Sequence, residues 1–304
     1  MFNTDKIRVL TEEDMKVYSV NNSNKNLLGV EYLYDRDIYG KDMVCAVLDT
    51  GCDMYHISLK DSIIGGRNFT DEGDVDNFID LHGHGTHVAG LIASTGYDIF
   101  EGGIAPQAKL LICKVLTSKG YGGIENIIAG LNYAIDNKVN VINMSLGSTA
   151  PSDELYETIQ RAIKNNIVVC CASGNMGRGD NGAIDELCYP GAYQEVIEVG
   201  AINYNGIPSR FSNSNNVLDC VCYGEDILSA FINNGFAVMS GTSQATPLIS
   251  GCILLLKEWF IREFNREPSR DEIYATLIKC STSINDYNKK QVGFGYIDLR
   301  KLFK

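Results

Sequence analysis

The chain has 304 residues, 45% of them hydrophobic, which is enough to bury a sizeable core and is not typical of a disordered protein. Its 38 acidic residues outnumber the 26 basic ones, and the formal charge of −12 argues against nucleic acid and anionic membranes as partners. No charged-then-apolar leader opens the sequence, and no apolar run approaches the roughly 20 residues that span a bilayer. We therefore expect a soluble, cytoplasmic protein.

Residues 1–25 are polar and weakly periodic, so we interpret them as an N-terminal arm that could serve as a short prosegment. From residue 26 to 304, no internal repeat, low-complexity tract or Pro/Ser-rich linker divides the sequence. We expect one domain over residues 26–304.

Short apolar runs alternate with amphipathic stretches through this domain. Five runs are almost entirely apolar, as strands are when both faces of a parallel sheet are covered: Met43–Asp49, Lys109–Leu116, Val141–Leu146, Ile167–Ser173 and Val196–Ile202. Apolar residues recur at helical spacing over 124–135 and 155–163, so these segments can form helices that cover the sheet. The pattern predicts a doubly wound α/β fold with a mostly parallel sheet and helices on both faces.

The ten cysteines show none of the spacing of a disulfide framework. Several lie inside strand-like apolar runs, namely Cys45, Cys113, Cys170, Cys171 and Cys222. A cysteine in such a run behaves as a small buried hydrophobe. We therefore expect free, reduced thiols, which suits a cytosolic compartment.

The segment "AVLDTGCD" places Asp49 at the end of an apolar strand. Open α/β sheets gather their reactive groups at this edge, where a carboxylate is held with little freedom to move. The alternative interpretation makes Asp49 the cap of a helix or turn.

The segment "DLHGHGTHVAGLIAS" contains three of the four histidines, His82, His84 and His87, bracketed by glycines ahead of a helix of small residues. An imidazole at such a helix start can act as a base. The H-x-H-x-x-H spacing could instead bind zinc, although a metallohydrolase of that kind would usually place a carboxylate at Thr86. We expect His87 to face inward and pack, since it follows His84 by three residues.

The segment "SGTSQATPLISG" places Ser243 at the entry to an apolar helix, at the positive end of the helix dipole, with Pro247 in the first turn. Helix capping alone would explain a serine here. A serine hydroxyl becomes nucleophilic when a neutral imidazole takes its proton, and that imidazole needs a buried carboxylate to fix its tautomer. Asp49, His84 and Ser243 would fill these roles, in that chain order.

The motifs "DTG", "HGTHVAG" and "GTSQATP", in this order, resemble those of the subtilisin-like serine proteases, the subtilases. Within the family, "VLDTGCD", "IIGGRNFTDEGD" and "VINMSLG" are most similar to the intracellular subtilisins of Gram-positive bacteria. The resemblance implies a subtilisin-like catalytic domain and a cytosolic serine endopeptidase that needs no cofactor for its chemistry. Asn175 in "CASGN" would donate to the tetrahedral oxyanion together with the backbone N–H of Ser243.

The resemblance also implies where a peptide or protein substrate binds. Two edge segments would pair with an extended substrate, and other residues would line the pocket for the residue before the cut. The full set is Gly120, Tyr121, Gly122, Ser145, Leu146, Gly147, Ala172, Ser173, Gly174 and Cys188. Cys188 stands where many relatives carry glycine, so its side chain should shorten the pocket.

A loop with the sequence "TDEGDVDN" brings Asp71, Asp74 and Asp76 close together. Hard oxygen ligands at this spacing could hold a structural Ca²⁺ ion, as in some thermostable members of the family. Acidic surface loops are more often simply solvated.

Several functions remain open from sequence. Within the protease class, the features also suit a dedicated processing enzyme, such as a leader peptidase of lanthipeptide (lantibiotic) biosynthesis. Other classes supply a catalytically inactive subtilase that serves as a binding scaffold, and a metal-dependent hydrolase. The sequence leaves open the natural substrate, the cleavage preference and the oligomeric state.

Overall fold

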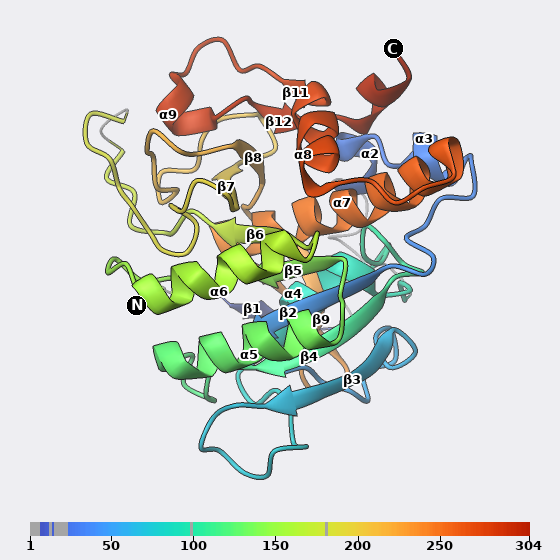
Figure 1. Cartoon of the computed structure of the whole chain (residues 1–304), viewed down its shortest axis with the longest axis vertical. Helices are drawn as coiled ribbons and strands as arrows, with labels where there is room; N and C mark the ends of the chain where they lie inside the picture. The colour runs from blue at the N-terminus through green and yellow to red at the C-terminus, as the bar shows by residue number, and fades with distance from the viewer. Residues whose placement is uncertain (1–6, 12–13, 15–23, 98–99, 180–181) are drawn as a thin grey trace.

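A mostly parallel sheet forms the middle layer of the computed structural model, which describes residues 7–11, 14, 24–97, 100–179 and 182–304. Its strands in the described residues are β2 (Val44–Asp49), β3 (Ile63–Asn68), β4 (Lys109–Lys114), β5 (Val141–Met144), β6 (Val168–Ala172), β7 (Ile197–Ile202), β8 (Cys220–Tyr223), β11 (Ser281–Thr282) and β12 (Tyr296–Ile297). Their spatial order is β11-β12-β8-β7-β6-β5-β2-β4-β3 (Figure 1). Among the strand pairs of this sheet that the structure describes, β11 and β12 alone are antiparallel.

The five strands predicted from apolar runs are β2, β4, β5, β6 and β7, and they are adjacent in the sheet. Their residues are almost all buried, because helices cover both faces. Sequence patterning did not single out β3, which lies at the edge of the sheet, contains two glycines and is only partly buried. The prediction of a parallel α/β sheet is therefore confirmed.

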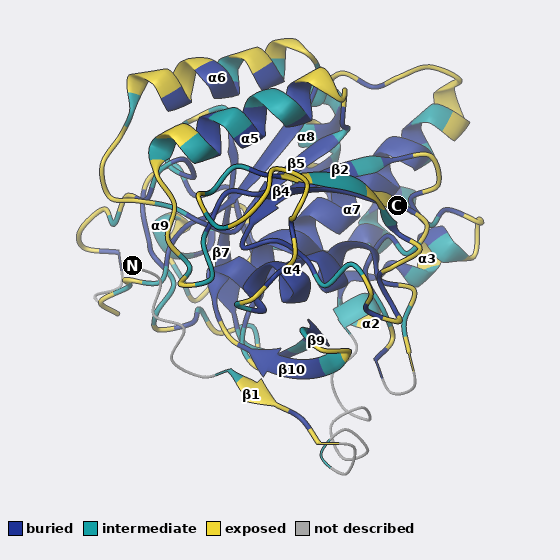
Figure 2. Cartoon of the chain, turned by 90° about the horizontal axis from the view of Figure 1, so that it is seen from below, coloured by how far each residue is buried: buried dark blue, intermediate teal, exposed yellow. Residues whose placement is uncertain are grey.

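Helices form a layer on each side of the sheet. On one face lie α4 (His84–Ala93) and α7 (Thr242–Phe264), whose apolar residues join one hydrophobic core. On the other face, α5 (Ile124–Asp136) and α6 (Asp153–Lys164) form a second core with the sheet. Figure 2 shows the exposed outer sides of α5 and α6, whereas all ten residues of α4 are buried. The doubly wound arrangement matches the prediction.

A smaller antiparallel sheet consists of β9 (Ile227–Phe231), β10 (Gly235–Met239) and β1 (Arg8–Val9), and β9 packs against α4. Strand β1 belongs to the predicted N-terminal arm, of which the structure describes residues 7–11, 14, 24 and 25; the other residues of the arm lie outside the described part. The remaining elements are α2 (Asn24–Leu28), α3 (Glu31–Tyr34), α8 (Arg270–Lys279), α9 (Lys289–Val292) and the 3₁₀ helix η1 (Leu299–Phe303).

The carboxyl ends of three neighbouring parallel strands carry polar motifs. Strand β2 ends at Asp49, Ser145 follows β5, and Asn175 follows β6. Since β5 lies between β2 and β6, these motifs lie along one edge of the sheet. The sheet thereby determines where the candidate functional residues meet.

The cysteine prediction is also confirmed, because all ten are free thiols and all ten are buried. Among the described residues, none of the helices combines the length and the apolarity needed to cross a bilayer.

Two acidic side chains are buried near the amino ends of β7 and β8, at the opposite end of the strands from the polar motifs. Glu198 in β7 has no exposed surface, and Asp219 directly before β8 is 8% exposed. Asn215 donates to Glu198 (3.1 Å), while the Tyr274 hydroxyl (2.6 Å) and the Glu198 backbone N–H (2.8 Å) donate to Asp219. Burial raises the pKa of Glu198 to about 8 and that of Asp219 to about 6. The folded state therefore favours the protonated acids.

We predict that Glu198 makes its full contribution to the stability of the fold below pH 4.5. This contribution declines as the pH rises from 4.5 to about 8, because Glu198 ionises at lower pH in the unfolded chain than in the folded one. The loss should be on the order of a few kcal/mol. Glu198→Gln, which stays neutral, should make the decline of Tm between pH 5 and 8 shallower in calorimetry. Glu157→Gln, an exposed control, should leave it unchanged, and an equal slope in both variants would contradict the assignment.

Candidate active site

A buried carboxylate and an imidazole meet at the carboxyl end of β2. His84 Nδ1 lies 2.7 Å from Asp49 Oδ1, and Asp49 has no exposed surface. The backbone N–H of Thr50 donates to the same oxygen (2.7 Å). Because a carboxylate only accepts, the proton of a neutral His84 ring lies on Nδ1 and leaves Nε2 basic.

The pKa of His84 is set by opposing effects. Burial by itself lowers it, because the cation loses its hydration. The negative charge and hydrogen bond of Asp49, with a further contribution from Asp80, outweigh burial and raise the pKa above its ordinary value of 6.5. The pair is therefore built to stabilise an imidazolium.

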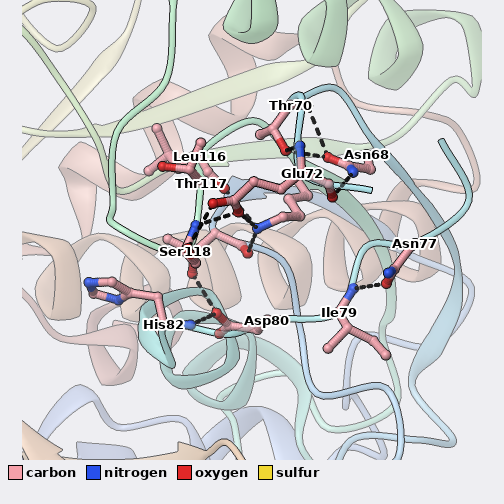
Figure 3. Close-up of polar contacts among 12 residues, drawn as sticks. Asn68, Thr70, Glu72, Asn77, Ile79, Asp80, His82, Leu116, Thr117 and Ser118 are labelled. Carbon is pink, nitrogen blue, oxygen red and sulfur yellow. Dashed lines mark hydrogen bonds and ion pairs between the residues drawn. The ribbon is translucent and has the colours of Figure 1, made fainter. Parts of the chain in front are cut away.

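Asp80 joins the end of β2 to the start of α4, a role that sequence analysis missed. Its side chain is 3% exposed. Its oxygens accept from the Thr50 hydroxyl, the backbone N–H groups of His82, Gly83 and Thr86, and the Thr86 hydroxyl, all at 2.7–2.9 Å; Figure 3 shows the bond to His82. An aspartate shortly before a predicted helix is a capping signal that could have identified it.

The other two histidines of the motif do not converge with His84. His87 Nε2 lies 3.1 Å from the backbone oxygens of Ile227 and Ala237, and burial lowers the His87 pKa to about 3. The rings of His82 and His84 are 6.3 Å apart, edge to face. Over the described ranges, no group of three or more His, Cys, Asp or Glu residues could hold a metal ion. The zinc interpretation therefore gains no support, and His87 packs as expected.

Ser243 is the second residue of α7 and does not cap it. The N-cap is Gly241, which makes no capping hydrogen bond through a side chain, so the capping interpretation is wrong. The Ser243 hydroxyl donates to the backbone oxygen of Ser145 (3.2 Å), and in the described part of the chain this is its one direct hydrogen bond. The side chain is 2% exposed.

Pro247 explains how the first turn of α7 is built. It lies in the second turn of the helix and not in the first, as the sequence had suggested. Proline has no N–H, so the carbonyl of Ser243, four residues earlier, has no helical donor. The Ser145 hydroxyl donates to that carbonyl (2.9 Å) and in turn accepts from Asn143 Nδ2 (3.1 Å). Ser145 thus contacts both the carbonyl and the hydroxyl of Ser243.

The amide of Asn175 is oriented by Thr242. The backbone N–H and the hydroxyl of Thr242 both donate to Asn175 Oδ1 at 2.9 Å. A backbone N–H can only donate, so it identifies the oxygen of the amide and leaves Nδ2 as the free donor. A Cβ added at Gly241 would lie 3.2 Å from Asn175 Nδ2 and 3.6 Å from Ser243 N, so two N–H donors approach the same region.

Two predicted substrate segments line one cavity of about 390 Å³. Gly120, Tyr121 and Gly122 contribute one wall, and Leu146 and Gly147 another. Apolar side chains close it, namely those of Leu116, Ile124, Ile127 and Leu155.

The residues predicted for the neighbouring pocket lie at the end of β6. Ala172 is the last residue of the strand, and Ser173, which has no exposed surface, and the buried Gly174 follow it. Gly174 has φ +105°, and a Cβ there would lie 3.1 Å from Cys188 Cβ. Cys188 is 1% exposed, and burial raises the pKa of its thiol to about 12. The buried Cys188 side chain therefore begins close to Gly174, the residue before Asn175.

The three aspartates predicted to bind calcium do not form a compact site. Asp71, Asp74 and Asp76 are exposed. Asn68 Nδ2 donates instead to the backbone oxygens of Glu72 (2.8 Å) and Asp74 (3.3 Å), so these carbonyls are occupied within the loop. Among the described residues no group of three or more acidic, histidine or cysteine side chains could hold a metal ion, so the calcium site stays a sequence prediction.

A carboxylate–imidazole pair and a buried serine at a helix start, on the carboxyl edge of a parallel sheet, are typical of several unrelated classes of serine hydrolase. A sequence model of the subtilase family matches residues 40–296. The chain belongs to this family and is a subtilisin-like serine endopeptidase.

Individual relatives agree with this placement. The chain is 49% identical to an "Intracellular serine protease" of Paenibacillus polymyxa over 254 residues. This alignment covers 83% of this chain and 78% of the relative. The chain is 44% identical over 270 residues to the "Major intracellular serine protease" of Bacillus subtilis (88% and 84%). It is 36% identical over 224 residues to "Subtilisin E" of the same organism (74% and 58%).

We predict that His84 titrates above pH 6.5 in the folded protein and that Asp49→Asn lowers this value, because the carboxylate charge is removed while burial persists. Histidine-selective NMR titration measures both. His87 should remain neutral in the same spectra down to about pH 3 or until unfolding. An unchanged His84 pKa in Asp49→Asn would show that the Asp49 charge is not the origin of the shift.

Proposed function

We propose that this protein hydrolyses peptide bonds through an acyl-enzyme on Ser243, with His84 as the general base and Asp49 as the residue that orients it. The 2.7 Å hydrogen bond from His84 Nδ1 to buried Asp49 carries the proposal, because it leaves Nε2 to accept a proton. The Ser243 hydroxyl, which now donates to Ser145, would rotate toward His84 Nε2 when substrate binds.

The oxyanion formed in this reaction would be bound by Asn175 Nδ2 and the backbone N–H of Ser243. The double hydrogen bond from Thr242 supports this role, because it fixes the Asn175 amide before any substrate arrives. Donors held in place at the site of developing charge stabilise the transition state more than water does.

An extended peptide would pair with residues 120–122 on one side and 145–147 on the other, with an apolar side chain in the cavity between them. The residue before the cut would lie over Ala172, Ser173 and Gly174. The buried Cys188 would limit the depth of that pocket and favour smaller side chains.

The substrates would be proteins or peptides inside the cell. The names of the relatives from Paenibacillus and Bacillus support this location, and the charge of −12 disfavours nucleic acid and anionic lipid as partners. The reaction needs no cofactor, and calcium at Asp71, Asp74 and Asp76 is a sequence prediction without support from the described contacts. The domain boundary near residue 26 is likewise a proposal.

Ser243→Ala should lower kcat on a peptide substrate on the order of 10⁶-fold while leaving Tm nearly unchanged, because only the nucleophile is lost. A fluorophosphonate should label the native protein at Ser243. Ser240→Ala, an exposed serine just before the helix, should keep both activity and labelling. An active Ser243→Ala protein would refute the proposed nucleophile, and an unlabelled native protein would favour a binding scaffold.

Asn175→Ala should lower kcat by about 10²–10³ with little change in KM, because the lost donor acts on the oxyanion and not on the bound substrate. Steady-state kinetics on one peptide amide separates the two parameters. A raised KM with unchanged kcat would assign Asn175 to substrate binding instead.

A further inference from the structure

A lysine is buried between the catalytic strand and the substrate edge. Lys114 ends β4 and is 1% exposed. Its ammonium donates to the backbone oxygens of Thr50 (2.8 Å) and Leu116 (3.0 Å). Thr50 directly follows Asp49, and Leu116 lines the cavity that residues 120–122 also line. One cation therefore contacts the backbone on both sides of the proposed active site.

The third group at this ammonium is a carboxylate from a distant loop. Glu72 Oε2 lies 3.5 Å from Lys114 Nζ. The same carboxylate accepts from the backbone N–H of Ser118 (2.6 Å) and from its hydroxyl (2.7 Å), as Figure 3 shows. These hydrogen bonds lower the pKa of Glu72, so it is ionised near neutral pH. Glu72 thus binds Ser118 directly and lies beside the Lys114 ammonium, and we call the Glu72–Lys114 pair the clasp.

The loop that carries Glu72 is itself held in place. Asn68, the last residue of β3, donates to the Glu72 backbone oxygen (2.8 Å). The backbone N–H and hydroxyl of Thr70 donate to Asn68 Oδ1 (2.9 and 2.7 Å), and the Thr70 hydroxyl accepts from the Glu72 N–H (3.2 Å). The carboxylate is thus presented from an ordered turn.

Ser118 begins the turn that leads into the proposed substrate edge. The N–H and the hydroxyl of Thr117 donate to the Tyr121 carbonyl (2.7 and 2.9 Å), and the N–H of Gly120 donates to the Thr117 carbonyl (2.9 Å). Tyr121 is itself 52% exposed. The outer side of the turn has little packing, and the Glu72 hydrogen bonds to Ser118 tie the turn to the loop that follows β3.

We propose that Glu72 and Lys114 are positioning residues that hold the 120–122 segment at a set distance from Asp49 and so determine the recognition of extended substrates. Neither side chain touches the reacting bond; they act through Ser118 and through the Thr50 carbonyl. The inference rests on the proposed function, because it concerns how tightly residues 120–122 bind the part of the peptide that lies several residues before the cleaved bond.

Substrates of different length test the proposal. An acylated tetrapeptide amide reaches residues 120–122, whereas an N-acetyl amino-acid ester with the same residue before the cut does not. Glu72→Gln should lower kcat/KM for the tetrapeptide about tenfold, mainly through KM, because the neutral amide weakens the charge-assisted hydrogen bonds to Ser118. The rate on the ester should stay within about twofold.

Glu157→Gln is the matched control, because it makes the same substitution and removes the same charge at an exposed residue of α6 that belongs to no predicted site. It should leave both substrates unaffected. Hydrogen exchange of the peptide covering residues 117–122 should accelerate in Glu72→Gln and not in Glu157→Gln.

The outcomes separate this inference from the proposed function. A selective loss on the tetrapeptide supports the clasp, whereas equal losses on both substrates, or none, overturn it. A native protein that hydrolyses neither substrate would overturn the peptidase mechanism itself. If Glu72→Gln proves unstable, Ser118→Ala, which removes only the hydroxyl contact, should show the same selectivity at a smaller size; an equal effect on both substrates there also overturns the clasp.

Discussion

The proposed active site depends on one interaction, the hydrogen bond between the buried Asp49 carboxylate and Nδ1 of His84. A carboxylate without exposed surface is costly unless it is paired, and the imidazole N–H together with the Thr50 N–H supplies that pairing. The same contact selects the His84 tautomer and raises the His84 pKa against the effect of burial. Asp80 holds Thr50 to the start of α4, so strand end and helix start cannot separate without breaking several buried hydrogen bonds.

At the start of α7, the hydroxyl of Ser243 is not used as a helix cap. Gly241 occupies the cap position, and Thr242 uses its own hydroxyl to orient Asn175. Pro247 removes the helical donor to the Ser243 carbonyl, and Ser145 replaces it from the end of β5. The turn that carries Ser243 is therefore held by the sheet in the absence of substrate, which is the arrangement that the proposed electrostatic catalysis requires.

Periodicity and strand-end logic were sufficient to predict the central sheet and the flanking helices, because those elements bury continuous apolar faces. The same reasoning predicted that Asp49 and His84 lie at one edge of the sheet, and in the structure the two side chains are paired. This reasoning could not reveal β3 or Asp80, since a half-buried edge strand and a carboxylate bound to backbone N–H groups leave no apolar pattern. The calcium prediction failed to find support for a related reason: spacing of aspartates says nothing about whether their side chains turn inward, and Asn68 already occupies the loop's carbonyls.

The segment between β3 and α4 links these observations. Two of its acids bind backbone N–H groups in opposite directions, Asp80 toward the start of α4 and Glu72 toward Ser118. The two partners serve different parts of the proposed reaction. Helix α4 begins with the general base His84, and Ser118 precedes the segment 120–122 that would bind the substrate. A carboxylate that accepts several N–H groups is stabilised more than one left in solvent, so these acids are ordered while the exposed aspartates beside them are not engaged. In a chain of charge −12, the buried Lys114 ammonium lies beside Glu72 and donates to the Thr50 carbonyl, while the Thr50 hydroxyl donates to Asp80, so Lys114 and Thr50 link the two acids.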